Sequence, residues 1–376
     1  MMSKAARGPG GGDRLGLRAL ARATLERQWL LHRRSSSIPT ALEHLVGLQA
    51  QATDPPYVGL WTRLTDFAFQ DLDRLALRRS VVRCALMRST LHLVTSRDAL
   101  RLRPILQPVQ DRALAATHGR HLIGLNLAEV AAATRAILAE GPMTYRDLGQ
   151  RLRARWPERD ADALANTARN VEALVQAPPA LWGGGARTGV AHMSEWLAKP
   201  LGTEVEPEPL VLRYLAAFGP ACVADIRAWS GLAGISEVVE TLRPSLRVFK
   251  SEAGVELFDL PRAPRPDPDT PAPVRLLGGF DGLILGFADR GRFLDDTHRR
   301  RIATANGIFH PLILIDGRVA GTWKLAIAKH VARVELTPFA PLRAEQRADL
   351  TREAEALLVT AIPDRSGHEV QFKPIK

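Results

Sequence analysis

Two glutamines separated by one residue, Gln49 and Gln51, are the most informative candidates for chemistry in the sequence. A carboxamide is no general base at pH 7, but it can orient a water molecule and place a carbonyl dipole beside positive charge. Residues at i and i+2 do not share a helix face, so we expect both to line a cleft where a helix ends. Pro55 and Pro56, which follow the motif, favour such an ending. The alternative interpretation is an ordinary polar helix terminus.

A second candidate is the segment 286–301, GFADRGRFLDDTHRRR, in which aromatic residues alternate with guanidinium groups. This pattern suits contact with phosphates and insertion beside bases. We expect a hairpin followed by a basic cluster. The candidate DNA-binding residues are Arg290, Arg292, His298, Arg299, Arg300 and Arg301. The alternative is a solvated charged turn, partly neutralised by Asp289, Asp295 and Asp296.

The motifs of other common chemistries are missing from the sequence. It contains no Gly-rich phosphate loop with lysine, no nucleophile elbow and no His-Glu-x-x-His. Cys84 and Cys222 lie far apart in apolar segments, which excludes a disulfide framework and a cysteine zinc site. His118 and His121 have no further ligand at metal spacing, so a surface helix end is the better interpretation of this pair. We therefore expect neither a metal nor a cofactor.

The charge balance points to an anionic partner. The 376 residues carry 51 Lys+Arg against 40 Asp+Glu, a formal charge of +11, and only seven of the basic residues are lysines. Arginine suits phosphate forks and base edges, although a GC-rich genome would also raise the arginine content. The hydrophobic fraction of 46% excludes a wholly disordered chain. Without a signal peptide or an 18-residue apolar stretch, we expect a disordered tail over 1–12 and a soluble, cytoplasmic, nucleoid-associated protein.

The elements around the glutamines must hold them in place. Apolar spacing predicts a helix over 13–32, a short helix capped by Thr40 and another helix over 57–64. Alternating residues predict a hairpin over 83–94. The segment 39–95 thus also ends in a hairpin, as the repeats described next do.

An internal repeat begins after these elements. A helix ends at Gly-Pro twice, at 141–142 and 219–220, and an acidic residue follows six positions after each glycine. Both copies continue through a third helix to a β-type hairpin. The expected hairpin strands are 180–182 and 190–193 in the first copy, and 246–249 and 255–258 in the second. This order is typical of a winged helix-turn-helix, a fold that binds DNA or serves in protein contacts.

The C-terminal part of the sequence has a different pattern. Six prolines over 261–273 predict an extended linker. Strands are then expected at 274–277, 283–287, 312–315, 319–323, 331–336 and 370–372, with a helix over 343–358. Asp316-Gly317 is a strong hairpin signal between two of these strands. Such strands predict a small β-barrel or a curled sheet, and we take the barrel as the first expectation.

Together these elements predict an α+β fold with three tandem winged helix-turn-helix modules and a C-terminal β-barrel. The modules are expected to span 13–124, which contains the glutamine motif, 125–200 and 201–262. A linker over 263–273 and a barrel over 274–376 complete the chain.

The sequence resembles the AlkZ-like (YcaQ-type) bacterial DNA glycosylases over nearly its whole length after the tail. The string GLQAQ at 47–51 matches the family's glutamine–residue–glutamine motif, and the strings within 280–300 and 306–323 resemble its C-terminal signature. One difference is Ala50, where the family usually has a larger aliphatic residue; this difference alters the packing beside the glutamines.

The resemblance implies three tandem winged helices and a β-barrel around a basic DNA channel. It also implies a monomeric enzyme that acts on double-stranded DNA, excises N7-alkylated purines and unhooks interstrand crosslinks, in repair or in self-resistance. Gln49 and Gln51 would then jointly position the water and stabilise C1′. Asp54 is a further candidate, although a helix cap is its simpler role. A non-catalytic winged-helix transcriptional regulator, or an interaction protein that uses the wings as contacts, remains the alternative.

Overall fold

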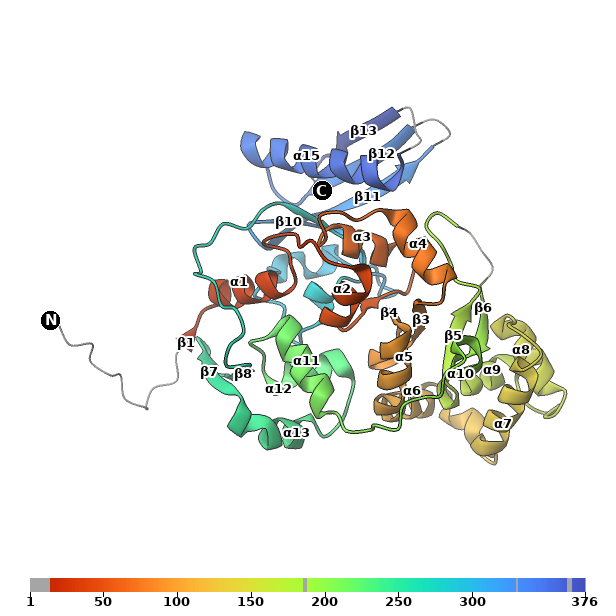
Figure 1. Cartoon of the computed structure of the whole chain (residues 1–376). Helices are drawn as coiled ribbons and strands as arrows, with labels where there is room; N and C mark the ends of the chain where they lie inside the picture. Colours follow the sequence, from red (N-terminus) through yellow and green to blue (C-terminus); the bar gives the residue numbers. More distant parts are fainter. Residues whose placement is uncertain (1–13, 185–187, 329–330, 364–366, 376) are drawn as a thin grey trace.

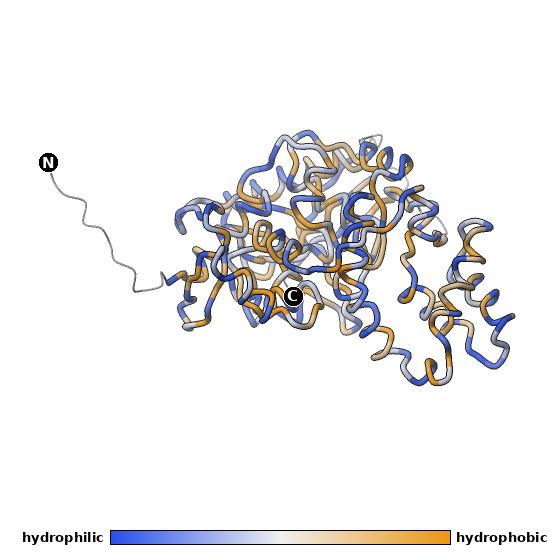
Figure 2. The backbone as a smooth tube through the Cα atoms, turned by 60° about the horizontal axis from the view of Figure 1, so that its bottom comes forward, coloured by the Kyte–Doolittle hydropathy of each residue, from blue (hydrophilic) through white to orange (hydrophobic). Residues whose placement is uncertain are grey.

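The computed structural model describes residues 14–184, 188–328, 331–363 and 367–375, so the expected tail lies outside the described residues. The helices and strands form a mixed α/β fold with three sheets, two of five strands and one of three (Figure 1). Apolar and polar stretches alternate along the chain (Figure 2), as expected when each element buries one face. The predicted mixture of helices and sheets is thus confirmed, and the details differ as described below.

The N-terminal region places the glutamine motif between two helices. Its elements are α1 (Leu17–Arg27), α2 (Ile38–His44), β2 (Leu48–Gln49), α3 (Pro55–Trp61), α4 (Phe69–Leu77), β3 (Val81–Ala85), β4 (Leu91–Thr95), α5 (Ser96–Ile105) and α6 (Gln107–His118). Two expectations are wrong here. Ser37 caps α2, because its side chain accepts the backbone N–H of Thr40 at 3.2 Å. Pro55 begins α3 rather than ending a helix, since the fixed φ of proline suits the first helical turn.

Two later regions each consist of three helices followed by a hairpin. The first contains α7 (Leu127–Leu138), α8 (Tyr145–Arg153), α9 (Ala161–Val171), β5 (Leu174–Ala177) and β6 (Gly189–His192), and α10 (Met193–Leu197) follows it. The second contains α11 (Glu208–Phe218), α12 (Val223–Ser230), α13 (Ile235–Leu242), β7 (Arg247–Ser251) and β8 (Glu256–Asp259). The strand expected at 180–182 is wrong. It lies earlier, at β5, because Pro178 and Pro179 cannot donate to a strand ladder.

The first two hairpins share one sheet, whose strand order is β2-β4-β3-β5-β6. Cys84 of β3 lies opposite Val175 of β5, so the two hairpins are joined edge to edge. The short strand β2, which carries Gln49, is the edge of this sheet. In the third hairpin, β7 instead pairs in parallel with β1 (Arg14–Leu15).

The C-terminal strands form an open sheet, so the predicted closed β-barrel is not present in the part of the chain that the structure describes. The elements are β9 (Arg275–Leu277), α14 (Gly282–Leu285), β10 (Leu312–Ile315), β11 (Arg318–Ile327), β12 (Val331–Pro338), α15 (Ala344–Ala361) and β13 (Gly367–Phe372). The strand order is β13-β12-β11-β10-β9. Residues of β12 alternate between buried and half-buried, and α15 packs its apolar face on the same core. Because α15 covers the apolar face, the sheet does not need to close.

The strand expected over 283–287 is wrong, since α14 begins there. A short apolar run does not distinguish a strand from a buried helix. Asp281 favours the helix by accepting the backbone N–H of Leu283 at 2.9 Å. The same carboxylate accepts two hydrogen bonds from the buried guanidinium of Arg63, at 2.8 and 2.9 Å. This pair joins the C-terminal region to the segment just after α3.

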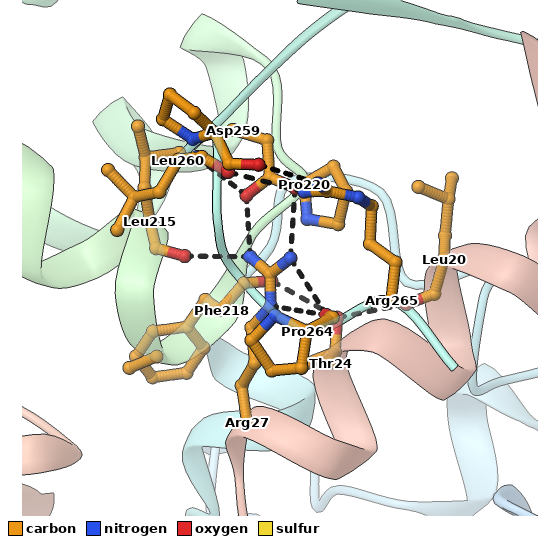
Figure 3. A network of polar contacts seen from close by, with 12 residues as sticks. Leu20, Thr24, Arg27, Leu215, Phe218, Pro220, Asp259, Leu260, Pro264 and Arg265 are labelled. Carbon is orange, nitrogen blue, oxygen red and sulfur yellow. Dashed lines mark hydrogen bonds and ion pairs between the residues drawn. The ribbon is translucent and has the colours of Figure 1, made fainter. Parts of the chain in front are cut away.

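The proline-rich linker packs against the body of the protein rather than forming a free spacer. The carbonyl oxygen of Thr270 accepts a hydrogen bond from Arg22 at 2.6 Å, and that of Pro264 accepts one from Arg27. Arg27 of α1 also forms a bidentate ion pair with Asp259 at the end of β8 (Figure 3). Its Nη1 donates to Oδ1 at 2.6 Å, and its Nη2 donates to Oδ2 at 2.9 Å. Arg265 of the linker binds the same carboxylate. These contacts fix the linker against α1 and the third hairpin.

Candidate functional site

The glutamine motif begins as the strand β2, which ends at Gln49, and the chain bends at Gln51. Gln49 lies opposite His92 in the ladder between β2 and β4, and the N–H of Ala50 donates to Leu91 O at 2.7 Å. The side chain of Ala50 is fully buried, whereas Gln49 is half-buried and Gln51 is exposed. Both carboxamides reach the same turn, since Gln49 bonds to Arg88 and Gln51 to Leu91, so the two glutamines lie on one face of the motif. No helix ends at the motif, so that expectation is wrong.

Gly47 turns the chain from α2 into β2. Its φ is +84°, and a Cβ at this position would lie 2.5 Å from a methyl group of Val94 and 3.0 Å from the carbonyl oxygen of Leu93. Only glycine fits a positive φ with so close an approach to β4. On the other side of the motif, Arg83 donates to the carbonyl oxygen of Ala50 at 2.5 Å. Both ends of the motif are thus held in place.

The two carboxamides are oriented by groups that can only donate hydrogen bonds. Gln49 Oε1 accepts from Arg88 Nη2 at 2.5 Å, and Gln51 Oε1 accepts from the backbone N–H of Leu91 at 3.0 Å. A guanidinium and a backbone N–H have no acceptor atom, so only the oxygen of each carboxamide can face them. Neither Nε2 atom has a hydrogen-bond partner among the described residues, and neither is a buried unsatisfied atom. Both amide groups are therefore available to a substrate.

Arg88 lies in the turn between β3 and β4, and no motif or spacing in the sequence selects it. Its backbone has φ +54° and ψ +20°, and its second terminal nitrogen donates to the carbonyl oxygen of Trp229. Loss of hydration and the charge of Arg290 lower the pKa of Arg88 to about 10, so the group is still a cation at neutral pH. The hairpin predicted over 83–94 has residue 88 in its turn. The sequence does not show that this turn lies beside Gln49, because that contact depends on the pairing of β2 with β4.

Arg290 connects the glutamine site with the second candidate segment. Its charge is felt by Arg88, and burial together with the charge of Arg299 lowers the pKa of Arg290 itself. Its guanidinium lies 5.3 Å from the centre of the Phe309 ring, while its buried Nε has no partner among the described residues. Arg88 bonds to Gln49, and its charge is close enough to that of Arg290, and that of Arg290 to Arg299, to shift their pKa values; we call these four residues the basic arc.

The remainder of the segment 286–301 is not the hairpin that we expected. A turn is followed by a 3₁₀ helix over Asp296–Arg301. Arg299 and Arg300 are exposed, and Arg299 pairs with Asp296 at 2.7 Å. His298 and Arg301 both pack on the ring of Phe339, at 4.6 and 3.9 Å. This part of the segment therefore presents basic groups at the surface.

Arg292 points in the opposite direction, into the protein. It is 5% exposed, and its guanidinium donates to Pro220 O at 3.0 Å and to Thr24 Oγ1 at 3.3 Å. It also lies 4.2 Å from the centre of the Phe287 ring. This position favours a structural role for Arg292 over the predicted contact with DNA.

Asp54 does not cap α3 with its side chain, although it occupies the position before the helix. Partial loss of hydration raises the pKa of its carboxyl group although the residue is exposed, and a hydrogen bond with the backbone of Gly183 and the charge of Arg83 offset part of the shift. Asp54 also lines a pocket of about 290 Å³ with Val58, Trp182 and Trp323. The pocket lies between α3 and β11, and sequence reasoning had not identified it.

His92, which lies opposite Gln49, is expected to make the free energy of unfolding depend on pH. Burial and the charge of Arg88 lower the pKa of His92 to about 3, far below the value of about 6.5 expected in the unfolded chain. Between these values only the unfolded state binds the proton, so we expect the free energy of unfolding to fall as the pH drops from 7 to 5. The slope from this residue approaches about 1.4 kcal/mol per pH unit.

Chemical denaturation at several pH values measures this slope. His92→Gln removes the titrating group and should flatten the dependence, leaving the part due to His44, whose pKa burial also lowers. An unchanged slope in this variant would show that His92 titrates normally in the folded protein.

The described residues contain no group of three His, Cys, Asp or Glu side chains that could hold a metal ion. Within the same residues, no single helix is long and apolar enough to cross a membrane. Two helical stretches, 107–122 and 127–138, meet the length and composition criterion only together, and they bend by 101° at their break.

Comparisons with known proteins address the family directly. A sequence model of the family "DNA glycosylase AlkZ-like" matches residues 42–359. The "Interstrand DNA cross-link repair glycosylase" of Streptomyces sahachiroi is 28% identical over 190 residues, which cover 46% of this chain and 48% of that protein. The match thus spans about half the length of this curated relative.

The fold is also shared with a solved structure. Streptomyces sahachiroi DNA glycosylase AlkZ has a TM-score of 0.77 at 21% identity, over 96% of this chain and 100% of that one. These matches support the glycosylase interpretation and not the alternative of a transcriptional regulator. Because the family model spans most of the sequence, the chain belongs to the AlkZ-like DNA glycosylase family.

Proposed function

We propose that this protein is a monofunctional DNA glycosylase that hydrolyses the N-glycosidic bond of cationic N7-alkylated purines in double-stranded DNA. The observation that carries the proposal is the pair of carboxamides on one face of the motif, with both amide groups open and the basic arc beside them. Family membership supports the same reaction class. Interstrand crosslinks and bulky adducts fall within the proposal because their N7-linked purines are also cationic.

The chemistry needs no acid when the leaving base is already cationic. The C1′–N9 electron pair moves to the purine, the sugar passes through an oxocarbenium-like state, and a water oxygen bonds to C1′ and releases a proton to solvent. Each glutamine oxygen keeps one lone pair beyond the hydrogen bond described above, and this lone pair can accept from the attacking water. A fixed carbonyl dipole also stabilises positive charge developing at C1′. We therefore assign Gln49 and Gln51 jointly to these two tasks.

We further propose that the three helical regions are winged helix-turn-helix modules over 13–124, 125–200 and 201–262, joined by the linker over 263–273 to a C-terminal domain over 274–376. The order of three helices and a hairpin in the second and third regions supports this division. The proposed reaction uses residues of one copy of the chain and needs no second copy, so we propose a monomer. The proposed substrate is chromosomal DNA, so we propose that the protein acts in the cytoplasm at the nucleoid. No cofactor has a part in the proposed reaction.

The proposal is tested by incubating the protein with a duplex that carries one N7-methylguanine and with an unmodified duplex of the same sequence. Chromatography of the released base should show free N7-methylguanine and an abasic strand only from the first. Tight binding to a particular unmodified sequence with no base release would instead favour the regulator.

A binding experiment tests the basic cluster separately. Arg300→Glu is expected to weaken DNA binding and to lower the slope of log K against log salt, by about 0.9 for each phosphate contact that is lost. The buried Arg292 is the matched control, and Arg292→Met should lower thermal stability while leaving the salt slope unchanged. An unchanged slope in Arg300→Glu would remove Arg300 from the set of DNA contacts.

A further inference from the structure

We infer that Arg88 is a positioning residue of the glycosylase site, which holds the Gln49 carboxamide oxygen in one orientation and so aims its remaining lone pair and amide group at the substrate. This inference rests on the proposed function and names a residue to which no role has been assigned. Its starting point is the hydrogen bond of 2.5 Å between Arg88 Nη2 and Gln49 Oε1.

The turn that carries Arg88 is held from several sides. Arg88 and Ser89 both have positive φ, +54° and +57°, which is unfavourable for residues other than glycine. Arg169 of α9 donates to Ser89 O at 3.0 Å, and Gln110 of α6 donates to Leu86 O at 2.8 Å. At Gly231, just after α12, a Cβ would lie 3.2 Å from the Arg88 backbone. Contacts with α6, α9 and the end of α12 therefore hold the backbone of Arg88 in place.

The surroundings of the guanidinium are unusual for a largely desolvated cation. Among the described residues no carboxylate forms an ion pair with Arg88. Its two acceptors are the carbonyl oxygens of Gln49 and of Trp229 in the last turn of α12. Carbonyl groups at a helix C-terminus lack intrahelical partners and carry partial negative charge, so they suit a cation. A cation whose hydrogen-bond acceptors are both neutral carbonyl oxygens forms a strong bond to Gln49.

This bond has a direct consequence for Gln49. Because Arg88 can only donate, the carboxamide cannot rotate by 180° without facing its amide group toward the guanidinium. A water held by the second lone pair of Oε1 would therefore occupy one site instead of two. The cation also polarises the carboxamide, which strengthens the two Nε2–H groups as donors. A backbone N–H does the corresponding task for Gln51, but without a charge.

The experiment compares Arg88→Ala and Arg88→Lys with wild type in single-turnover release of N7-methylguanine, with protein in saturating excess over the duplex. Arg88→Ala should slow the saturated rate by about 10- to 100-fold, the usual range for a hydrogen bond to a charged group. The affinity for unmodified duplex should change by less than about threefold, since the guanidinium is directed at Gln49 and Trp229. Arg88→Lys retains a charged donor and should recover part of the rate.

Arg112→Ala is the matched control. Arg112 donates to the carbonyl oxygen of Gly231, next to the same end of α12, but makes no contact with the glutamines. This variant should release base at the wild-type rate, so that a general disturbance of α12 is separated from the loss of the Gln49 bond.

A double-mutant cycle makes the test independent of folding effects. If Arg88 acts through Gln49, Arg88→Ala should slow release by less than about threefold in a Gln49→Ala background. Saturated rates within twofold of wild type for both Arg88 variants, or an equal slowing in both backgrounds, would overturn the inference. These outcomes leave the proposed function intact, because release of N7-methylguanine by the wild-type protein tests it separately.

Discussion

Replacing both motif glutamines, Gln49→Ala with Gln51→Ala, is expected to slow single-turnover release of N7-methylguanine by about 10³-fold while duplex binding is retained. The reason is the shared face on which both carboxamides lie, each with its oxygen fixed by a donor. Removing either glutamine leaves one water contact, so the single variants should fall between wild type and the double variant. The rates are measured with excess protein, and binding is measured by fluorescence anisotropy on unmodified duplex.

Gln150→Ala is the control for this experiment, because Gln150 is exposed on α8, away from the motif in the sequence. It should leave base release unchanged. A folded double variant that released base within fivefold of wild type would remove the glutamines from the reaction.

Asp259→Asn is expected to lower the free energy of unfolding by about 3–5 kcal/mol, the usual result of leaving a buried charge without its partner. Asp259 and Arg27 are 0% and 1% exposed in their side chains, and two hydrogen bonds join them (Figure 3). The amide of this variant would offer a single acceptor oxygen to the guanidinium of Arg27, which donates to both carboxylate oxygens of Asp259 in the wild-type protein. Denaturation in guanidinium chloride measures the change.

The control for this effect is a pair at the surface. Glu240 is 60% exposed and pairs with Arg243 three residues along, and Glu240→Gln should give the wild-type denaturation midpoint because surface pairs contribute little. If Asp259→Asn also had the wild-type midpoint, the Arg27–Asp259 pair would not be what holds α1 to the third hairpin.

Local sequence patterns predicted the elements whose signals are complete within a few residues. The helical spacing over 13–32 corresponds to α1, and Asp316-Gly317 corresponds to the hairpin between β10 and β11, where both residues have positive φ. The same approach failed at 283–287, where an apolar run fits a strand and a buried helix equally well. It also failed to predict that the sheet stays open, since the packing of α15 on the sheet depends on contacts between distant segments.

The site was predicted in its residue types but not in its geometry. The motif itself selected Gln49 and Gln51, but the expectation of a helix end is wrong, because Gln49 ends the strand β2 and Gln51 lies in the bend that follows. Arg88 carries no local signal, because its importance depends on β2 pairing with β4 and on α12 lying beside the turn. Arg292 is the opposite case. The sequence pattern selected it as a DNA contact, but its side chain is buried, and residue type alone does not distinguish a buried arginine from one at the surface.

A comparison of leaving bases of different charge shows whether the enzyme depends on a base that is already cationic. Two duplexes of one sequence carry either N7-methylguanine, which is cationic, or O6-methylguanine, which is neutral, at the same position. No residue protonates the leaving base in the proposed reaction, so we expect the first base to be released at least about 100-fold faster than the second. Equal rates would contradict this mechanism, because they would require a group that protonates the base, with Asp54 and its raised pKa as the first candidate.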